Sequence, residues 1–141
     1  ALHSSTFLGN PVGCAACLAA IAELADKGLV QVARRKGARI RKQFEDMQTR
    51  HDLIGDVRGV GMMIGVELVK DRASKAPATD ETAHVVSFAQ SRGVIVNQGG
   101  KAGNVLKLSP PFVITKAQIG AALEVIEQGL SAARRKTRPT Q

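Results

Sequence analysis

Apolar residues recur along the chain with two different periods, which predict where helices and strands form. Between residues 29 and 51 they recur at steps of three and four, as on one face of a helix, and this face carries Ala33, Gly37, Ile40, Phe44 and Met47. Mainly basic residues occupy the rest of that helix, namely Arg34, Arg35, Lys36, Arg39, Arg41 and Lys42. Residues 54–59 and 61–69 predict strands instead, and the second is so continuously apolar that we expect it to be well buried.

Capping signals mark the ends of the other helices. The pair Asn10-Pro11 predicts a helix start, because Asn caps a first turn and Pro suits the first helical position, and Lys27-Gly28 predicts its end. A third helix is expected over residues 79–93, with acidic residues in its first turn. Thr115 and Gln118 have capping-box spacing at the start of a last helix, whose buried face carries Ile119, Leu123, Ile126 and Leu130.

Two further short apolar segments, residues 94–96 and 105–109, predict strands on either side of a glycine-rich turn. The order is therefore two helices, two strands, a helix, two strands and a helix. This order predicts an α+β fold, with a small mixed or antiparallel sheet and helices on one face.

Composition and charge argue against a nucleic-acid-binding protein and against a membrane protein. The 141 residues suit one domain, and 20 Lys and Arg against 12 Asp and Glu give a formal net charge of +8. Four Phe and no Trp or Tyr leave few rings for base stacking, so we expect no nucleic-acid partner. No apolar run approaches the roughly 20 residues that cross a bilayer, and residues 1–6 lack the charged and apolar regions expected of a signal peptide. We expect a cytoplasmic chain without a membrane partner.

Local motifs offer little chemistry of their own. Cys14 and Cys17 form a C-x-x-C pair without a second ligand pair, so we expect two buried thiols on one helix face. Gly59-Val60-Gly61 fails as a dinucleotide fingerprint, because a strand follows instead of a helix. The three His residues show no metal-ligand spacing. These motifs predict neither a metal site nor a catalytic residue.

The segment from Ser4 to Pro11 concentrates hydroxyl and backbone N–H groups just before a helix N-terminus, where anions such as phosphate bind well. Continued through residue 16, it resembles the class III (subgroup II) aminotransferases, which are fold-type I enzymes that use pyridoxal phosphate. Three further blocks agree with that family in order and spacing, namely Ile54–Val69, Arg92–Ile95 and Gly103–Thr115.

The resemblance implies only the C-terminal part of such an enzyme. Residues 1–28 correspond to the end of the large domain and a connecting helix, residues 29–133 to the C-terminal small domain, and residues 134–141 to a basic tail that we expect to be disordered. In the family, the Schiff-base lysine, the acid paired with the pyridine nitrogen and the glycine-rich phosphate loop lie upstream of the matched region. We therefore assign no catalytic residue here and expect this chain alone to be inactive.

Two contributions to an active site carry over from the resemblance. Ser5 and Thr6 match residues that contact the pyridoxal phosphate of the partner subunit in a homodimer, although helix capping is an alternative role. Lys107 occupies a position where many relatives hold the substrate carboxylate with Arg. Lysine offers a compact charge instead of a planar fork, so either a different anionic group or a role at a strand edge is open. Arg58 is an alternative anion contact.

These features predict three functions. The first is amino-group transfer from an amine or amino acid to a 2-oxo acid in a full-length aminotransferase. The second, indicated by Lys107, is a related phospholyase that acts on a phosphorylated amine. The third is a stand-alone interaction module that binds an acidic partner through residues 34–42. For a C-terminal part we also expect exposed apolar surface on the helix over residues 11–28, with self-association or partial disorder over residues 1–30.

Overall fold

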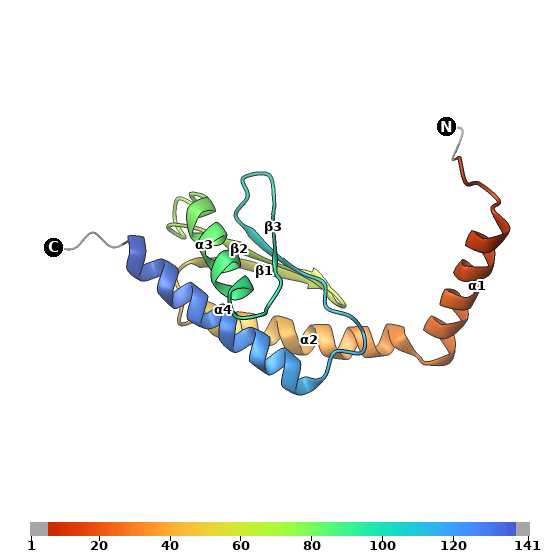
Figure 1. Cartoon of the computed structure of the whole chain (residues 1–141). Helices are drawn as coiled ribbons and strands as arrows, with labels where there is room; N and C mark the ends of the chain where they lie inside the picture. Colours follow the sequence, from red (N-terminus) through yellow and green to blue (C-terminus); the bar gives the residue numbers. More distant parts are fainter. Residues whose placement is uncertain (1–5, 138–141) are drawn as a thin grey trace.

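A four-stranded antiparallel sheet with strand order β1-β2-β4-β3 forms the centre of the fold (Figure 1). The computed structural model describes residues 6–137. The strands are β1 (Ile54–Val60), β2 (Met63–Leu68), β3 (Asn97–Gly99) and β4 (Val105–Leu108), and the helices are α1 (Pro11–Asp26), α2 (Leu29–Gln48), α3 (Thr79–Gln90) and α4 (Lys116–Thr137). The predicted α+β class with an antiparallel sheet is confirmed.

Helices α2, α3 and α4 cover one face of the sheet. Along β2, the side chains of Ile64, Val66 and Leu68 are buried, whereas Met63 is exposed and Gly65 and Glu67 are half-buried. Because successive strand residues point to opposite faces, only one face of β2 packs against the helices. The expectation that this segment is well buried is thus right for one face and wrong for the other.

The core joins that face to the predicted apolar stripe of α2. Phe44, Val66 and Leu106 are fully buried in one cluster with α3 and α4 residues such as Val85 and Leu130. Burial of each large apolar side chain contributes about 1.5–3 kcal/mol to stability. The predicted face of α2 is confirmed, with Gly37, Ile40, Phe44 and Met47 buried.

Gly37 allows α2 to approach the turn between β1 and β2. A Cβ atom at this position would lie 1.7 Å from the carbonyl oxygen of Gly61. Since real Cβ atoms do not approach an oxygen so closely, any larger residue would push α2 away from the sheet.

The predicted caps are present. The Asn10 side chain accepts a hydrogen bond of 3.1 Å from the Gly13 amide, and Gly28 has a left-handed φ of 56° directly after α1. At the start of α4, the Thr115 amide donates to Gln118 Oε1 at 2.8 Å, and the Gln118 amide donates to Thr115 Oγ1 at 3.2 Å. This reciprocal pair is a capping box.

Two predicted boundaries are wrong. The strand expected at residues 94–96 lies at β3 instead, where Asn97 pairs with Lys107 and Gly99 with Val105. The last helix also continues to Thr137, so the first four residues of the expected basic tail are helical. Apolar content therefore placed strand β3 wrongly, because pairing with β4 decides which residues form it, and they are the polar residues 97–99.

The end of α2 is joined to α4 by charged groups. The Arg50 guanidinium lies 2.8 Å from Glu127 Oε1, and His51 Nε2 lies 3.2 Å from the same oxygen. Hydrogen bonding from Arg50 first, and from His51 next, lowers the pKa of Glu127 below its ordinary value. The Arg72 guanidinium donates to the carbonyl oxygens of Gln48, His51 and Ile54 and so satisfies the end of α2.

Helix α1 has no buried residue and contacts α2 only near its end, so it projects away from the sheet (Figure 1). Its exposed apolar side chains include Val12, Leu18 and Ile21, which confirms the expected apolar surface. Cys14 and Cys17 are exposed as well, so the expectation of buried thiols is wrong within this structure. None of the helices between residues 6 and 137 combines the length and apolar character needed to span a membrane.

Candidate functional site

The open face of the sheet, opposite the helices, carries Lys107. Strand register places Arg58 beside Gly65 and Gly65 beside Lys107, so the two cations flank a glycine in one row across three strands. Lys107 is exposed and forms no hydrogen bond or ion pair with residues 6–137. Its ammonium is thus available to an anion on this face.

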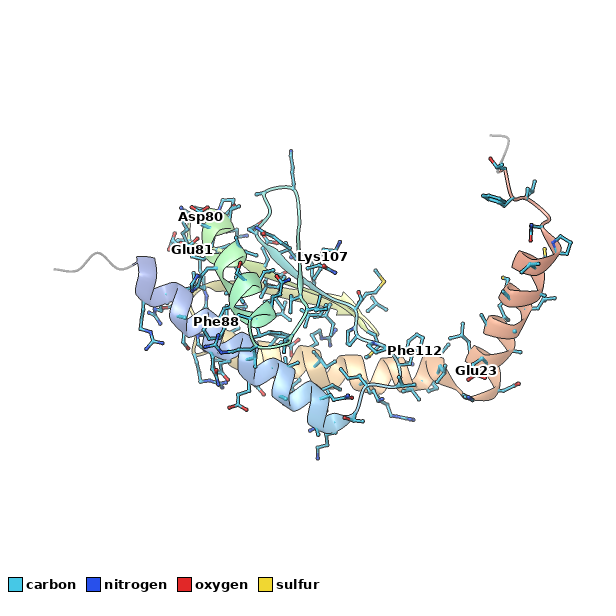
Figure 2. All side chains as sticks on the ribbon, in the orientation of Figure 1. Glu23, Asp80, Glu81, Phe88, Lys107 and Phe112 are labelled. Atoms are coloured by element: carbon cyan, nitrogen blue, oxygen red, sulfur yellow. The ribbon has the colours of Figure 1, made fainter. Side chains whose placement is uncertain are left out.

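Lys107 lies across a second glycine. A Cβ atom built on Gly99 would lie 2.2 Å from Cδ of Lys107, so the lysine stem occupies the space that a side chain at Gly99 would need. Figure 2 shows Lys107 at the sheet, well separated from Glu23 on α1. Two glycines on neighbouring strands therefore leave the lysine unobstructed.

Arg58 differs from Lys107 because its charge is already paired. Its Nη1 atom lies 2.6 Å from Asp56 Oδ2 and 2.6 Å from Glu67 Oε2. The hydrogen bonds to Asp56 and Glu67 raise the pKa of Arg58 above its ordinary value. An anion on this face would compete with two carboxylates at Arg58, but with no carboxylate of residues 6–137 at Lys107. The structure favours Lys107 over the alternative contact at Arg58.

The other predicted site residues lie at the start of α1. Thr6 is exposed in a turn that ends at Gly9, which has a left-handed φ of 75°. The Asn10 amide of this turn donates to the Phe7 carbonyl at 3.1 Å. Ser5 lies outside the described residues. Figure 1 places this turn far from the sheet, so the fold does not bring Thr6 and Lys107 together.

The donors at this turn fit a phosphate but not a whole cofactor. A hydroxyl and a helix N-terminus are donors that phosphate accepts. The two cavities described below are not lined by any residue of α1 or of the turn. Thr6 is thus an exposed hydroxyl donor that lies outside both of these cavities.

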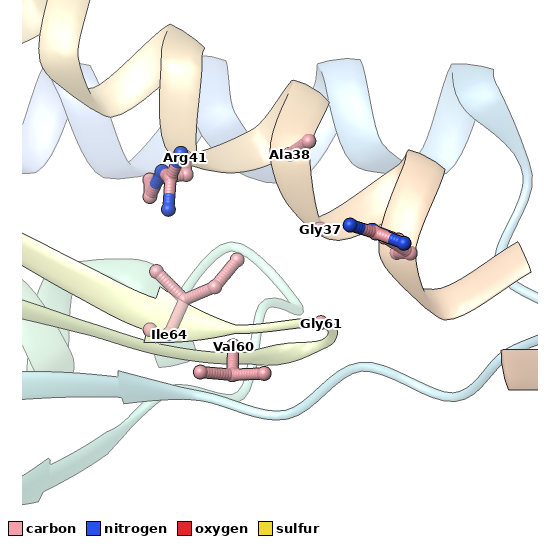
Figure 3. Close-up of a pocket in the computed structure, with 8 residues that line it drawn as sticks. Gly37, Ala38, Arg41, Val60, Gly61 and Ile64 are labelled. Atoms are coloured by element: carbon pink, nitrogen blue, oxygen red, sulfur yellow. The ribbon is translucent and has the colours of Figure 1, made fainter. Parts of the chain in front are cut away.

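The larger cavity, of about 910 Å³, is a mainly apolar groove beside Lys107. It lies between α4, the segment 92–97 and the loop that follows β4. The smaller cavity, of about 320 Å³, lies between α2 and the β1–β2 hairpin, and Figure 3 shows Arg41 facing Ile64 there, with Gly37 opposite Gly61. Arg41 also pairs with Glu45 on its own helix at 3.1 Å. The sequence predicted neither cavity.

Lys36 differs from most of the other basic residues of α2, which are exposed. It is half-buried, and its Nζ atom donates to the carbonyl oxygens of Phe112 and Ile114, both at 2.6 Å. The partners lie 76 and 78 residues away, so no local pattern signals this contact. Lys36 joins α2 to the loop that follows β4.

A comparison with known proteins gives the family. The family model described as Aminotransferase class-III matches residues 1–130. With this fold and this match, the chain belongs to the class III aminotransferase family.

The matched relatives differ in their reactions. Over 129 residues and 92% of this chain, it is 42% identical to a leucine/methionine racemase of Thermococcus litoralis and covers 29% of that protein. It is 37% identical to an alanine–glyoxylate aminotransferase 2 homolog of Arabidopsis thaliana over 92% of this chain and 27% of the relative. With an ethanolamine-phosphate phospho-lyase homolog of Caenorhabditis elegans it shares 32% identity, over 92% of this chain and 28% of the relative. The chain thus spans less than a third of these relatives.

A solved structure agrees in fold. An amine transaminase from an uncultivated Pseudomonas species, in a form with bound pyridoxal phosphate, superposes with a TM-score of 0.82 at 30% identity. The match covers 94% of this chain and 30% of that enzyme. The similarity therefore includes most of this chain but a minor part of the enzyme.

Proposed function

We propose that this chain is the C-terminal part of a pyridoxal-phosphate-dependent enzyme that transfers an amino group from an amine or amino acid to a 2-oxo acid. The observation that carries the proposal is the match of residues 1–130 to the family, together with the ammonium of Lys107 on the open sheet face, which has no partner among residues 6–137. Both substrates of such a transfer commonly carry a carboxylate, which an exposed ammonium binds.

Each segment has a role in this proposal. Residues 1–28 end the large domain and link it to the small domain, residues 29–133 form the small domain, and residues 134–141 form a tail. The cofactor supplies an electron sink for the carbanion formed next to the amino group. Ser5 and Thr6 donate hydrogen bonds to its phosphate in the partner subunit of a homodimer, which we place in the cytoplasm. Lys107 binds the anionic group of the substrate and orients the substrate carbon that reacts.

This chain alone is inactive in the proposal, because the lysine that binds the cofactor belongs to a segment outside residues 1–141. An amino-transfer assay of the 141-residue chain, with pyridoxal phosphate added, tests this point. We expect no turnover of any amino donor with a 2-oxo acid. Turnover by the purified chain, abolished by a substitution within it, would contradict the proposal.

Two other reactions are favoured by specific observations. The identity of 42% to a racemase favours inversion at the carbon that carries the amino group. Lysine instead of arginine at position 107, with a phospho-lyase among the relatives, favours elimination of phosphate from a phosphorylated amine. All three reactions begin at the carbon that carries the amino group. They are therefore told apart by the substrate consumed and the product formed.

One assay of the full-length enzyme that contains this chain separates these reactions. It is given an amino donor with a 2-oxo acid, L-leucine alone, or phosphoethanolamine alone. Amino transfer consumes the 2-oxo acid, racemisation produces the D-amino acid, and elimination releases phosphate. We expect the first, and we expect Lys107→Met to raise the KM for the acidic substrate about tenfold or more. D-leucine or phosphate as the main product would overturn the proposed transfer.

A further inference from the structure

Lys36 is one of the basic residues of α2, and its side chain contacts another part of the protein as well as solvent. Its Nζ atom donates to the carbonyl oxygens of Phe112 and Ile114 at 2.6 Å each, and its side chain is half-buried. Arg35 and Lys42 on the same helix are exposed and make no hydrogen bond or ion pair with residues 6–137. The environment of Lys36 is therefore specific to its position.

The two carbonyl groups belong to the loop of residues 109–115, which connects β4 to α4. Pro110 and Pro111 in this loop have no N–H groups to donate to a neighbouring strand. Inside the loop, the Ile114 amide donates to the Pro111 carbonyl at 3.0 Å. Since hydrogen bonds from a charged donor are stronger than neutral ones, Lys36 is a principal attachment of this loop to α2.

The same loop forms one wall of the 910 Å³ groove beside Lys107. Ser109, Pro110, Pro111, Val113 and Ile114 line the groove together with Lys107. The loop begins directly after Leu108, the last residue of β4, so it is continuous with the strand that carries Lys107.

We infer that Lys36 is a positioning residue for the substrate-binding face: its ammonium holds loop 109–115 against α2 and thereby fixes the groove wall and Lys107. The inference rests on the proposed function, in which Lys107 binds the substrate anion. Lys36 acts in this inference through the loop, because its Nζ atom donates to main-chain carbonyls. Its effect is on substrate binding and not on the reacting bonds.

Hydrogen–deuterium exchange on the 141-residue chain tests the attachment itself. In Lys36→Met, we expect amides of Ile114, Gln118 and Ile119 to exchange about tenfold faster or more, because charge-assisted hydrogen bonds to the loop are lost. Lys42→Met is the matched control, since it removes the same charge from the same helix and leaves these amides unchanged. Lys36→Arg keeps charge and donors, and we expect it to restore most of the protection.

Two outcomes of this experiment would overturn the inference. One is unchanged exchange at Ile114 and Ile119 in Lys36→Met. The other is an equal acceleration at these amides and at core amides such as those of Val66 and Leu106, because Lys36 would then stabilise the whole domain without holding the loop.

Kinetics of the full-length enzyme test the effect on the site. We expect Lys36→Met to raise the KM for the acidic substrate about tenfold while kcat changes less than about threefold, and Lys42→Met to change neither. A fall in kcat with unchanged KM would overturn the positioning role. If the proposed function is wrong, even the wild-type enzyme shows no turnover of these substrates, while the exchange experiment still reports on the attachment.

Discussion

Helices α1 and α2 follow each other in the chain, yet they relate to the rest of the molecule in opposite ways. Helix α2 buries Gly37, Ile40, Phe44 and Met47 against the sheet, whereas α1 buries none of its residues. The polar residues of α2 lie mainly on its other faces, but α1 is apolar on all sides. In folded proteins, a helix that is apolar on all sides is typically buried, with other parts of the protein covering it on several sides.

The two helices therefore serve different purposes: α2 contributes to the stability of the domain, and α1 offers a surface for contacts. The unit formed by residues 29–137 has its own core, so its stability depends on packing within it. Side chains of α1 contribute little to that core and instead present an apolar surface for contacts with other protein surface. Substitutions on α2 should therefore lower the free energy of unfolding, whereas substitutions on the surface of α1 should mainly change association.

The largest effect is expected at Phe44. We expect Phe44→Ala to lower the free energy of unfolding by about 3–5 kcal/mol, since the side chain is fully buried and leaves a cavity. Leu18→Ala on α1, where the side chain is 69% exposed, should change it by less than about 0.5 kcal/mol. Urea denaturation monitored by circular dichroism measures both. Equal losses would show that α1 belongs to the same core.

A glycine pair gives a second test. We expect Gly37→Ala to destabilise the domain by about 1–3 kcal/mol, because the added Cβ would lie 1.7 Å from the Gly61 oxygen. Gly13→Ala on α1 is the matched control, since the atom nearest to its added Cβ is 3.9 Å away. Alanine is the better helix former there, so the control should not destabilise. Urea denaturation curves give the free energy of unfolding of the two variants. A Gly37→Ala protein as stable as wild type would refute the close approach of α2 to the Gly61 carbonyl.

A smaller effect should follow from acid. Because Arg50 and His51 lower the pKa of Glu127 in the folded state, the carboxylate stabilises the fold above its ordinary pKa and loses that contribution as pH falls through the lowered value. We expect Glu127→Gln to be less stable than wild type at pH 7, with the difference shrinking below about pH 4. Urea titrations between pH 7 and pH 3 measure the difference. A constant difference over that range would remove Glu127 from the acid response.

Local signals predicted much of the fold. The caps at Asn10 and at Thr115 with Gln118 join groups within three residues of each other, so their geometry follows from the sequence. The strand expected at residues 94–96 was misplaced because its position depends on pairing with β4, several residues away. Interactions within one helical turn were predictable, whereas strand register was not.

The site was less predictable for the same reason. Lys107 was identified through a family resemblance, and only the strand register shows that its neighbour Arg58 is neutralised by two carboxylates. The contact of Lys36 has no local signal, because its carbonyl partners lie more than 70 residues away. Burial of Cys14 and Cys17 was predicted from their composition alone, but burial needs a covering surface that residues 6–137 do not provide.

The smallest effect on stability, and the most specific test of α1, is expected from a change on its apolar surface. We expect the 141-residue chain to self-associate through α1, where Leu18 and Ile21 are 69% and 57% exposed. The double variant Leu18→Ser with Ile21→Ser should reduce that association while changing the unfolding free energy of residues 29–137 by less than about 0.5 kcal/mol. Sedimentation velocity over a range of concentrations measures the association. Val60→Ser is a control, since Val60 is 87% exposed but lies at the β1–β2 turn. If only this control lowered the association, the apolar surface that matters would lie on the sheet and not on α1.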